Sequence, residues 1–431
     1  MPHLRSLALD IEPLRVHRDF RLIFCGQLIN TMGSQITQVA LPYELYLLTR
    51  SALALGAMAT IQLIAVLLVS PMAGAVADAV DRRRLLLGTQ VGLCSVSTAL
   101  ALLAASGQAT PWQLYLLAFV QAGVNALDRP ARQAIVPRLV SRKRLTAAIT
   151  LNQVGTKTAS VLGPSVGGLL IASTGLSLAF GLDAASFLAG IAALLAIAGL
   201  PPLGEVAKPG WSAILEGLSY VKRTPAVLAA FCVDLDAMIF GLPVALFPIL
   251  ALNVFHAGAT GLGLLTSAPA AGAVIGGLSS GWLRRVRHPG RVVLGAVGVW
   301  GVAITLFGFT RLLPLALVFL ALAGGADAIS AVMRWTIIQV SAPDQLRGRV
   351  TALNSMVVNA GPRLGDMEAT GIAALISVQV SVISGGLLSL LGLIVVARAF
   401  PRFATFDAQM LEAAAARGMA PTEPSLAAGQ P

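Results

Sequence analysis

The sequence predicts an all-α integral membrane protein in which twelve transmembrane helices form two pseudo-symmetric six-helix halves. Three observations carry this prediction: the composition, a series of long apolar segments, and a repeat at an offset of 202 residues. The chain has 431 residues, of which 56% are hydrophobic and only 11% are charged. Soluble domains carry about 25% charged residues, so the charges of this chain are too few to cover a water-soluble surface.

The apolar segments are long enough to cross a membrane as helices. The hydrocarbon core of a bilayer takes about 20 apolar residues per helix, whereas a membrane β-barrel would show short segments of alternating polarity. The first 19 residues are polar and basic and lack the apolar core of a cleavable signal peptide. We place the predicted transmembrane helices at residues 20–48, 53–77, 85–105, 112–134, 146–172, 176–199, 226–253, 259–282, 292–310, 313–339, 349–376 and 379–400.

The basic residues predict the orientation of the chain. With the N-terminus in the cytoplasm, 26 of the 30 Lys and Arg fall in cytoplasmic segments, and only Arg50 and Arg311 fall in outer loops. Because Lys and Arg accumulate on the cytoplasmic side of membrane proteins, we expect both termini to be cytoplasmic. The net charge of +11 then follows from topology and does not indicate a nucleic-acid partner.

A repeat relates the two halves. Shifting the sequence by 202 residues aligns "AGAVADAVDRRRLLLG" with "IGGLSSGWLRRVRHPG", and it brings Arg132 onto Arg334 and Gly163 onto Gly365. Parallel repeats imply a pseudo-two-fold axis along the membrane normal and a substrate site near the midplane. The predicted organisation is an N-terminal tail at 1–19, six-helix halves at 20–199 and 226–400, a cytoplasmic linker with an interfacial helix at 200–225, and a C-terminal tail at 401–431.

Several motifs resemble a known family. The glycine, aspartate and basic pair around "GAVADAVDRR" are similar to the signature that the major facilitator superfamily carries after its second helix, although Ala79 and Asp81 depart from it. The resemblance to the superfamily covers about residues 20–400. The run "LDRPARQAIVPRLV", followed by "LTAAITLN" and "VLGPSVGGLL", resembles its drug- and siderophore-exporter branch. The resemblance implies the superfamily's fold, a location in the inner membrane of a bacterial cell, and a proton-driven exporter of drugs or siderophore-like molecules that works by alternating access.

The signature after the second helix is predicted to act as a conformational latch. Asp78 can accept hydrogen bonds from the N–H groups that begin the predicted helix 349–376, where the helix dipole favours a carboxylate. Arg82 can reach Asp128 at the end of the predicted helix 112–134. Such contacts would form in one conformation only and bias the alternation. The alternative is that the arginines anchor the topology alone. The predicted latch residues are Gly74, Asp78, Arg82, Arg83 and Asp128.

The fifth predicted helix carries a glycine motif that resembles the antiporter motif of the superfamily. Its residues are Gly163, Pro164, Gly167 and Gly168. Proline removes a helix hydrogen bond, and glycines let two backbones approach closely. We expect the motif to bend the predicted helix 146–172 against a neighbouring helix and to seal the path against proton leak. Tight helix packing alone would explain the motif equally well.

Polar side chains inside the spans predict a substrate cavity. In the first helix, polar residues follow one another at steps of four and three, on one face, and such a stripe faces protein or water rather than lipid. For any single amide, hydrogen bonding between helices is the alternative. The predicted cavity residues are Gln27, Asn30, Thr31, Ser34, Gln38, Gln121, Asn125, Gln153, Lys157, Asn359 and Arg363.

Charged residues inside a span cost about 2.5–3.5 kcal/mol each and therefore indicate function. Lys157 and Arg363 could attract an anionic or catecholate substrate. A proton-coupled exporter also needs a carboxyl group that loads and releases a proton. The candidates, in order, are Asp327, Asp366, Asp234 and Glu368. Each could instead belong to a structural ion pair, such as Arg363 with Asp366, and the helical spacing points Asp234 and Asp236 in different directions.

Other chemistries lack the residues they need. The sequence contains no Walker-type "GxxxxGK[ST]", so ATP is not expected to drive transport, and it shows no catalytic set and no metal-ligand or cofactor motif. We expect a monomer without cofactors whose partners are the lipid bilayer, a small-molecule substrate and protons. Two other functions stay open: an uptake symporter for a small nutrient in the same fold, and a membrane sensor or scaffold that does not transport.

Overall fold

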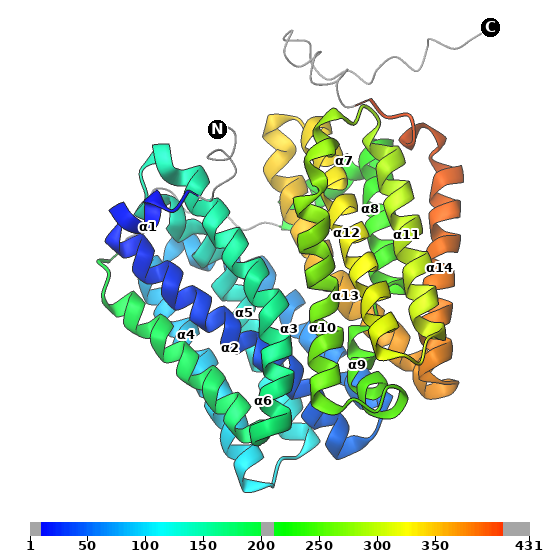
Figure 1. Cartoon of the computed structure of the whole chain (residues 1–431). Helices are drawn as coiled ribbons and strands as arrows, with labels where there is room; N and C mark the ends of the chain where they lie inside the picture. Colours follow the sequence, from blue (N-terminus) through cyan, green and yellow to red (C-terminus); the bar gives the residue numbers. More distant parts are fainter. Residues whose placement is uncertain (1–9, 200–210, 408–431) are drawn as a thin grey trace, which may run out of the picture. The chain divides into compact units, whose positions relative to one another are not determined.

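The computed structural model describes residues 10–199 and 211–407, and these ranges contain helices and no strands (Figure 1). The outer parts of both predicted tails and residues 200–210 of the predicted linker lie outside the described residues. The same holds for the side chains of the predicted latch residues Gly74 and Asp78. The chain divides into two compact units. Unit 1 comprises Met1–Pro209 and Val244–Ala270, and unit 2 comprises Gly210–Pro243 and Ala271–Pro431.

Unit 1 is built from the helices of the first predicted half and a segment of the second. In chain order its elements are α1 (Glu12–Val16), α2 (Arg18–Thr49), α3 (Ala52–Ala79), α4 (Arg82–Ser106), α5 (Pro111–Leu139), η1 (Arg142–Arg144), α6 (Leu145–Leu195), η2 (Val244–Leu246), α9 (Phe247–Ile249), η3 (Leu250–Val254) and the first part of α10 (Gly258–Leu278). Within α6, Gly175 has φ 84° and ψ 175°, a conformation that only glycine adopts readily. This break separates the two helices that the sequence predicts on either side of it.

Unit 2 contains most of the second predicted half. Its elements are α7 (Trp211–Arg223), α8 (Pro225–Phe240), the second part of α10, η4 (Ser280–Arg285), α11 (Pro289–Phe309), α12 (Leu313–Ser341), α13 (Asp344–Leu375), α14 (Val378–Ala399) and η5 (Pro401–Phe403). Helix α7 lies within the predicted linker. It is held to the rest of unit 2 by an ion pair between Glu216 and Arg349 and by a hydrogen bond from the Tyr220 hydroxyl to the Ser341 carbonyl oxygen, at 2.5 Å.

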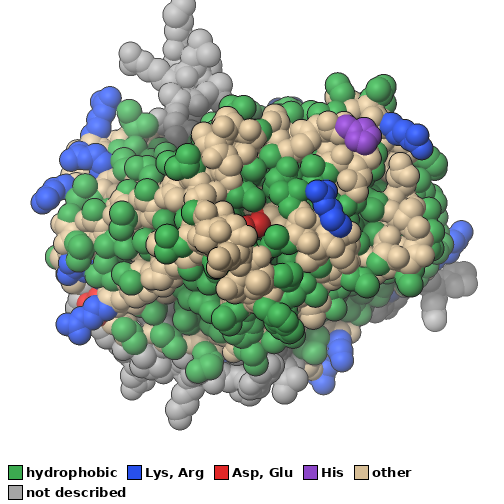
Figure 2. Space-filling model, turned by 90° about the horizontal axis from the view of Figure 1, so that it is seen from below, with side chains coloured by type: hydrophobic (Ala, Val, Ile, Leu, Met, Phe, Trp, Pro, Cys, Tyr) green, Lys and Arg blue, Asp and Glu red, His purple; other side chains and the backbone are tan. Residues whose placement is uncertain are grey.

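The helices match a bilayer in length and composition. Eight segments of the described chain are long and apolar enough to cross a membrane, and one of them, Arg142–Leu195, contains the break at Gly175. Helices α2, α5 and α13 are not among the eight, and these three carry many of the polar residues that the sequence analysis selects. The predicted count of twelve spans stays a prediction. Large hydrophobic side chains such as Leu278 and Leu375 are exposed, as expected for a protein solvated by lipid. Figure 2 shows the molecule from below, toward the ends of the helices, with hydrophobic side chains over much of this face and few charged ones.

The charged turn between α3 and α4 has two local tasks. Asp81 is the N-cap of α4, and its carboxylate accepts hydrogen bonds from the backbone N–H groups of Arg83 (2.9 Å) and Arg84 (3.1 Å). Arg83 in turn donates to the carbonyl oxygens of Leu194 (2.7 Å) and Leu195 (2.9 Å), at the C-terminal end of α6. A cation is favourable there because the last carbonyl groups of a helix lack partners and carry partial negative charge. Asp81 departs from the superfamily signature, and its role as the N-cap of α4 explains why an aspartate stands there.

Replacing Asp81 by alanine is expected to destabilise unit 1 by about 0.5–2 kcal/mol, because two N–H groups at the start of α4 lose their acceptor. The free energy of unfolding can be measured by titrating the purified protein with sodium dodecyl sulfate in mixed micelles. Asp81→Asn is the matched control, because asparagine is an equally good N-cap. Equal destabilisation by both substitutions would show that the capping bonds do not matter.

Candidate functional site: a buried arginine in each unit

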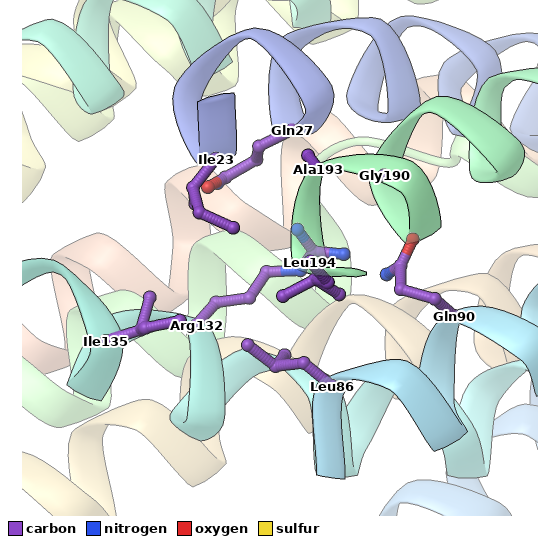
Figure 3. A pocket seen from close by; sticks show the side chains of 9 residues that line it. All are labelled: Ile23, Gln27, Leu86, Gln90, Arg132, Ile135, Gly190, Ala193 and Leu194. Atoms are coloured by element: carbon purple, nitrogen blue, oxygen red, sulfur yellow. The ribbon is translucent and has the colours of Figure 1, made fainter. Parts of the chain in front are cut away.

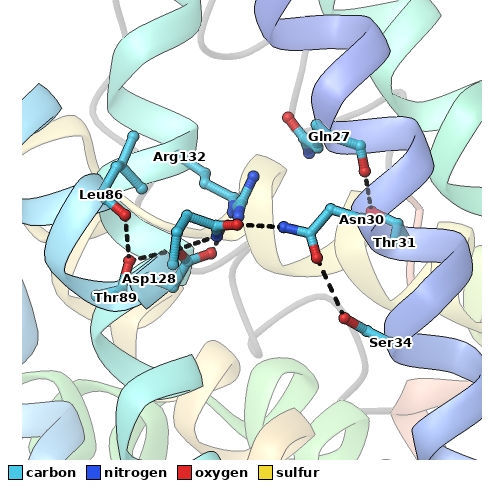
Figure 4. A network of polar contacts seen from close by, with 9 residues as sticks. Gln27, Asn30, Thr31, Ser34, Leu86, Thr89, Asp128 and Arg132 are labelled. Atoms are coloured by element: carbon cyan, nitrogen blue, oxygen red, sulfur yellow. Dashed lines mark hydrogen bonds and ion pairs between the residues drawn. The ribbon is translucent and has the colours of Figure 1, made fainter. Parts of the chain in front are cut away.

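In unit 1, a polar centre forms around Arg132 on α5. Arg132 makes an ion pair with Asp128, one helical turn earlier, and Asp128 is buried. The same carboxylate accepts hydrogen bonds from the hydroxyl of Thr89 (2.7 Å) and the side-chain amide of Gln90 (3.3 Å), both on α4 (Figure 4). The sequence analysis expects Asp128 to face Arg82. The structure gives Asp128 contacts with Arg132 in its own helix and with Thr89 and Gln90 on α4, the helix that begins at Arg82.

The predicted stripe on α2 joins this centre. The Asn30 side-chain amide donates to Oε1 of Gln90 at 2.5 Å, and the Ser34 hydroxyl donates to Oδ1 of Asn30 at 3.5 Å (Figure 4). Thr31 bonds within its own helix, to the backbone oxygen of Gln27. Asn30 is buried, so it links helices α2 and α4 and does not line an open cavity.

A small cavity lies beside the centre of unit 1. Its volume is about 10 Å³, and Figure 3 shows Gln27, Gln90 and Arg132 around it together with apolar side chains of α2, α4, α5 and α6. A cavity of this size can hold about one water molecule. It is therefore too small for a substrate in this conformation, but it is polar enough to hydrate the Arg132 guanidinium.

In unit 2, a second polar centre forms around Arg334 on α12. The guanidinium lies 2.6 Å from the Asp234 carboxylate on α8 and 3.5 Å from that of Asp327, and it donates to the Ser330 hydroxyl at 2.6 Å. Arg334 and Asp234 are buried, whereas 48% of the Asp327 side chain is exposed. Two of the predicted coupling carboxyls, Asp234 and Asp327, thus meet at one arginine.

The two centres occupy equivalent positions of the repeat. Helices α5 and α12 both have 29 residues, and Arg132 and Arg334 are each the twenty-second. The shift of 202 residues also brings Asp128 onto Ser330. In unit 1 the arginine takes its counter-charge from its own helix. In unit 2 the equivalent position is a serine, and α8 supplies the main carboxylate instead. A buried charge needs such a partner, because desolvation costs several kcal/mol for each ion.

Asp234 and Asp236 point to different neighbours, as their spacing predicts. Asp236 accepts a hydrogen bond from the Ser389 hydroxyl on α14 at 3.3 Å, whereas Asp234 pairs with Arg334 on α12. The backbone of Gly392 on α14 also lies against the Asp236 carboxylate. Asp236 therefore contributes to helix packing, and Asp234 to the charged centre.

The other predicted site residues are spread over several helices of both units. On α13, Asp366 is buried, while Asn359, Arg363 and Glu368 are partly exposed. The Asn359 amide donates to the backbone oxygen of Ser355 in its own helix. In unit 1, Gln121 is partly exposed, and the exposed members of the predicted set are Gln38, Asn125, Gln153 and Lys157.

Two buried carboxyl groups in unit 1 escape the sequence analysis. Asp183 on α6 is fully buried and accepts hydrogen bonds from the hydroxyls of Thr37 (2.6 Å) and Ser97 (2.7 Å), which joins α6 to α2 and α4. Glu44 on α2 is buried as well, and its Oε2 atom has no hydrogen-bond partner among the described residues. The signal for both was an acidic residue within a predicted apolar span, the same signal that selected Asp234 and Asp366.

The glycine motif of α6 packs between two helices of unit 1. A Cβ atom at Gly163 would lie 2.4 Å from the Cβ atom of Gln35 on α2. A Cβ atom at Gly168 would lie 2.4 Å from the carbonyl oxygen of Ala259 and 2.9 Å from the Cα atom of Gly263, both on α10. These distances leave no room for a side chain, so the motif acts through close helix packing. Ser165, between the glycines, donates to the hydroxyl of Ser267 on α10 at 2.8 Å.

The comparisons with known proteins agree with this architecture. A family model described as transmembrane secretion effector, within the major facilitator superfamily, matches residues 9–424. The chain belongs to this family. It is therefore a multi-pass membrane protein and a secondary transporter, not an enzyme, and the predicted all-α membrane fold and superfamily are confirmed.

Individual relatives give the same assignment. The chain is 28% identical to the enterobactin exporter EntS of Citrobacter koseri, over 90% of this chain and 94% of that one. It is 29% identical to EntS of Escherichia coli O1:K1, over 89% and 92%. Among solved structures, the nucleoside transporter NupG superposes with a TM-score of 0.73 at 12% identity, covering 89% of this chain and 99% of NupG. A bacterial homologue of the iron transporter ferroportin gives 0.66 at 18% identity, with 90% and 99% covered. At such identities the structures support the fold alone.

Proposed function

We propose that this transporter exports a siderophore-like or drug-like small molecule from the cytoplasm across the bacterial inner membrane, driven by protons that flow inward. The named relatives are enterobactin exporters aligned over nine-tenths of the chain, which supports export and a catecholate-like substrate class. The positive-inside distribution of Lys and Arg supports cytoplasmic termini. A proton gradient, and no bound cofactor, supplies the energy.

The observation that carries proton coupling is one arginine between two carboxylates in unit 2. Asp234 lies 2.6 Å from Arg334 in a buried environment and neutralises its charge. Asp327 lies farther away, at 3.5 Å, and about half of its side chain is exposed. Asp327 can therefore gain or lose a proton through water without leaving Arg334 as an uncompensated buried charge, which would cost several kcal/mol. This makes Asp327 the coupling carboxyl of the proposed cycle.

Alternating access requires contacts that exist in one conformation and separate in the other. Residues 244–270, which the repeat assigns to the second half, pack in unit 1 against helices of the first half. The side-chain amide of Asn253 donates to the Tyr46 hydroxyl at 2.6 Å, and Ser165 donates to Ser267 at 2.8 Å. We assign these hydrogen bonds, with the Gly168–Gly263 contact, to the closure of the outer side. Two hydrogen bonds and one contact between glycine backbones can separate at a small cost in free energy.

The test uses purified protein in liposomes that hold a trapped pH dye and an imposed pH gradient. Enterobactin, macrolides and lipophilic cations are added in turn, and proton flux is recorded for the unmodified protein and Asp327→Asn. We expect substrate-triggered flux from the unmodified protein and, from Asp327→Asn, no more than from empty liposomes. Asp236→Asn is the control and should retain the flux, because its hydrogen bond from Ser389 can still form.

The same assay separates the proposal from its rivals. Substrate that accumulates together with protons, in the same direction, would indicate an uptake symporter. Substrate movement that ignores the gradient would reduce the protein to a facilitator, and binding without movement of any substrate would favour a sensor. Flux that Asp327→Asn leaves unchanged would assign coupling to another carboxyl, with Asp366, Asp183 and Glu44 as the next to substitute.

A further inference from the structure

Unit 2 contains an apolar groove between the second part of α10, η4, α11 and α12. Its volume is about 620 Å³, and every lining residue is apolar or glycine. Helices α10 and α12 approach closely at its base, where a Cβ atom at Gly276 would lie 2.8 Å from the carbonyl oxygen of Gly325. The wall residues Ile275, Trp282 and Val299 are each at least 50% exposed, so the groove opens outward from the helices. A volume of this size suits a small organic molecule or a lipid chain.

One end of the groove carries two cations. Trp282 lines the groove, and Arg285 stands three residues later in η4, a 3₁₀ helix in which residues at this spacing lie on the same side. On α11, Arg291 precedes the lining residues Gly295 and Val299 by four and eight residues, so all three share a face. Both arginines are exposed, and neither has an ion-pair partner among the described residues. Nearby Arg287, in contrast, pairs with Asp407 at 2.7 Å.

We propose that this groove binds an anionic phospholipid of the cytoplasmic leaflet, with an acyl chain in the groove and the phosphate at Arg285 and Arg291. The predicted orientation places the cationic end on the cytoplasmic side, where basic pockets between transmembrane helices bind anionic headgroups. From Arg291 to Val299 the groove runs eight residues along α11, about 12 Å, close to one leaflet of hydrocarbon, about 15 Å. The glycines leave room for the chain, because a Cβ atom at Gly295 would have no atom within 4 Å. The proposal needs only membrane insertion in this orientation and does not depend on what is transported.

The test is native mass spectrometry of the full chain, delipidated in a neutral detergent and titrated with dioleoyl phosphatidylglycerol or dioleoyl phosphatidylcholine. Gly295→Leu fills the groove, and Arg285→Gln with Arg291→Gln removes its charge. Gly181→Leu is the matched control, because Gly181 on α6 also has no atom within 4 Å of its Cβ position and lies outside the groove. We expect one phosphatidylglycerol to bind preferentially, Gly295→Leu to abolish that binding, and the double arginine variant to weaken it by about 30-fold. Gly181→Leu should bind like the unmodified protein.

Several outcomes would overturn the proposal. Equal affinity for both lipids would show that the arginines do not recognise a headgroup. Equal binding by Gly295→Leu and Gly181→Leu would place the bound lipid elsewhere on the surface. Displacement of the lipid by a transported compound at equal concentration would assign the groove to substrate rather than to phospholipid. Melting temperatures of all variants, recorded in the same detergent, separate lost binding from lost folding.

Discussion

Replacing Asp234 by asparagine is expected to lower the free energy of unfolding by about 3 kcal/mol, the lower end of the range for breaking a buried ion pair. Asp234 is the partner that lies 2.6 Å from Arg334, and both side chains are buried. Without it, the guanidinium keeps only the Ser330 hydroxyl and Asp327 at 3.5 Å. The expected loss lies at the low end of the range because Asp327 still offsets part of the charge of the Arg334 guanidinium. Titration with sodium dodecyl sulfate in mixed micelles measures the change.

Two further variants make this prediction specific. Asp236→Asn, two residues later on α8, should change the free energy of unfolding by less than about 1 kcal/mol, because its asparagine can still accept a hydrogen bond from Ser389. Asp234→Leu combined with Arg334→Met should recover most of the loss, since a buried ion pair can often be replaced by apolar residues of similar size without cost. If Asp234→Asn unfolds like the unmodified protein, the ion pair does not hold α8 and α12 together.

Replacing Gly168 by valine is expected to reduce transport by about 5–150-fold while membrane insertion stays intact. The new Cβ atom would lie 2.4 Å from the Ala259 carbonyl oxygen, so α6 and α10 must move apart. Overpacking of this kind costs about 1–3 kcal/mol. That cost applies only to the conformation in which the contact exists, so it shifts the equilibrium between conformations by the stated factor. Liposome transport assays measure the reduction.

A second readout separates a shifted equilibrium from a damaged fold. In a variant that lacks Cys25, Cys94 and Cys232, a cysteine at Asn253 should react faster with a membrane-impermeant thiol reagent when Gly168→Val is present, because the contacts around residues 244–270 open. Gly181→Val is the control, since its Cβ position has no atom within 4 Å. Loss of transport without faster labelling would mean that the motif does not hold the outer side closed.

The sequence was sufficient for the fold class and for the family. The hydropathy of a segment depends only on its own residues, and the thickness of the bilayer sets the length of a helix that crosses it. Apolar runs therefore predict membrane helices without knowledge of the helices that pack against them. The motifs are local as well. The "VLGPSVGG" run predicts close packing, and the structure provides it against α2 and α10. The break at Gly175 coincides with the predicted gap between the fifth and sixth helices.

The same reasoning predicted only part of the candidate site. The sequence analysis selects Asn30, Asp234 and Asp327 because polar groups inside spans are costly, and Asp128 as a latch residue. Each of the four lies in one of the two polar centres. Asp183 and Glu44 carry the same signal and were not selected. Polarity therefore marks candidate residues, but it does not rank them.

What the tertiary structure alone decided is which charges meet. Asp128 pairs with Arg132 in its own helix, although Arg82 was the predicted partner, and Asp234 pairs with Arg334, one hundred residues away. Spacing along a chain fixes which residues share a helix face. The pairing of faces depends on how helices rotate and pack against one another, and that depends on all the side chains at the contact together. The sequence by itself thus determined the membrane helices, the repeat and the family, whereas helix packing determined the partners of each buried charge.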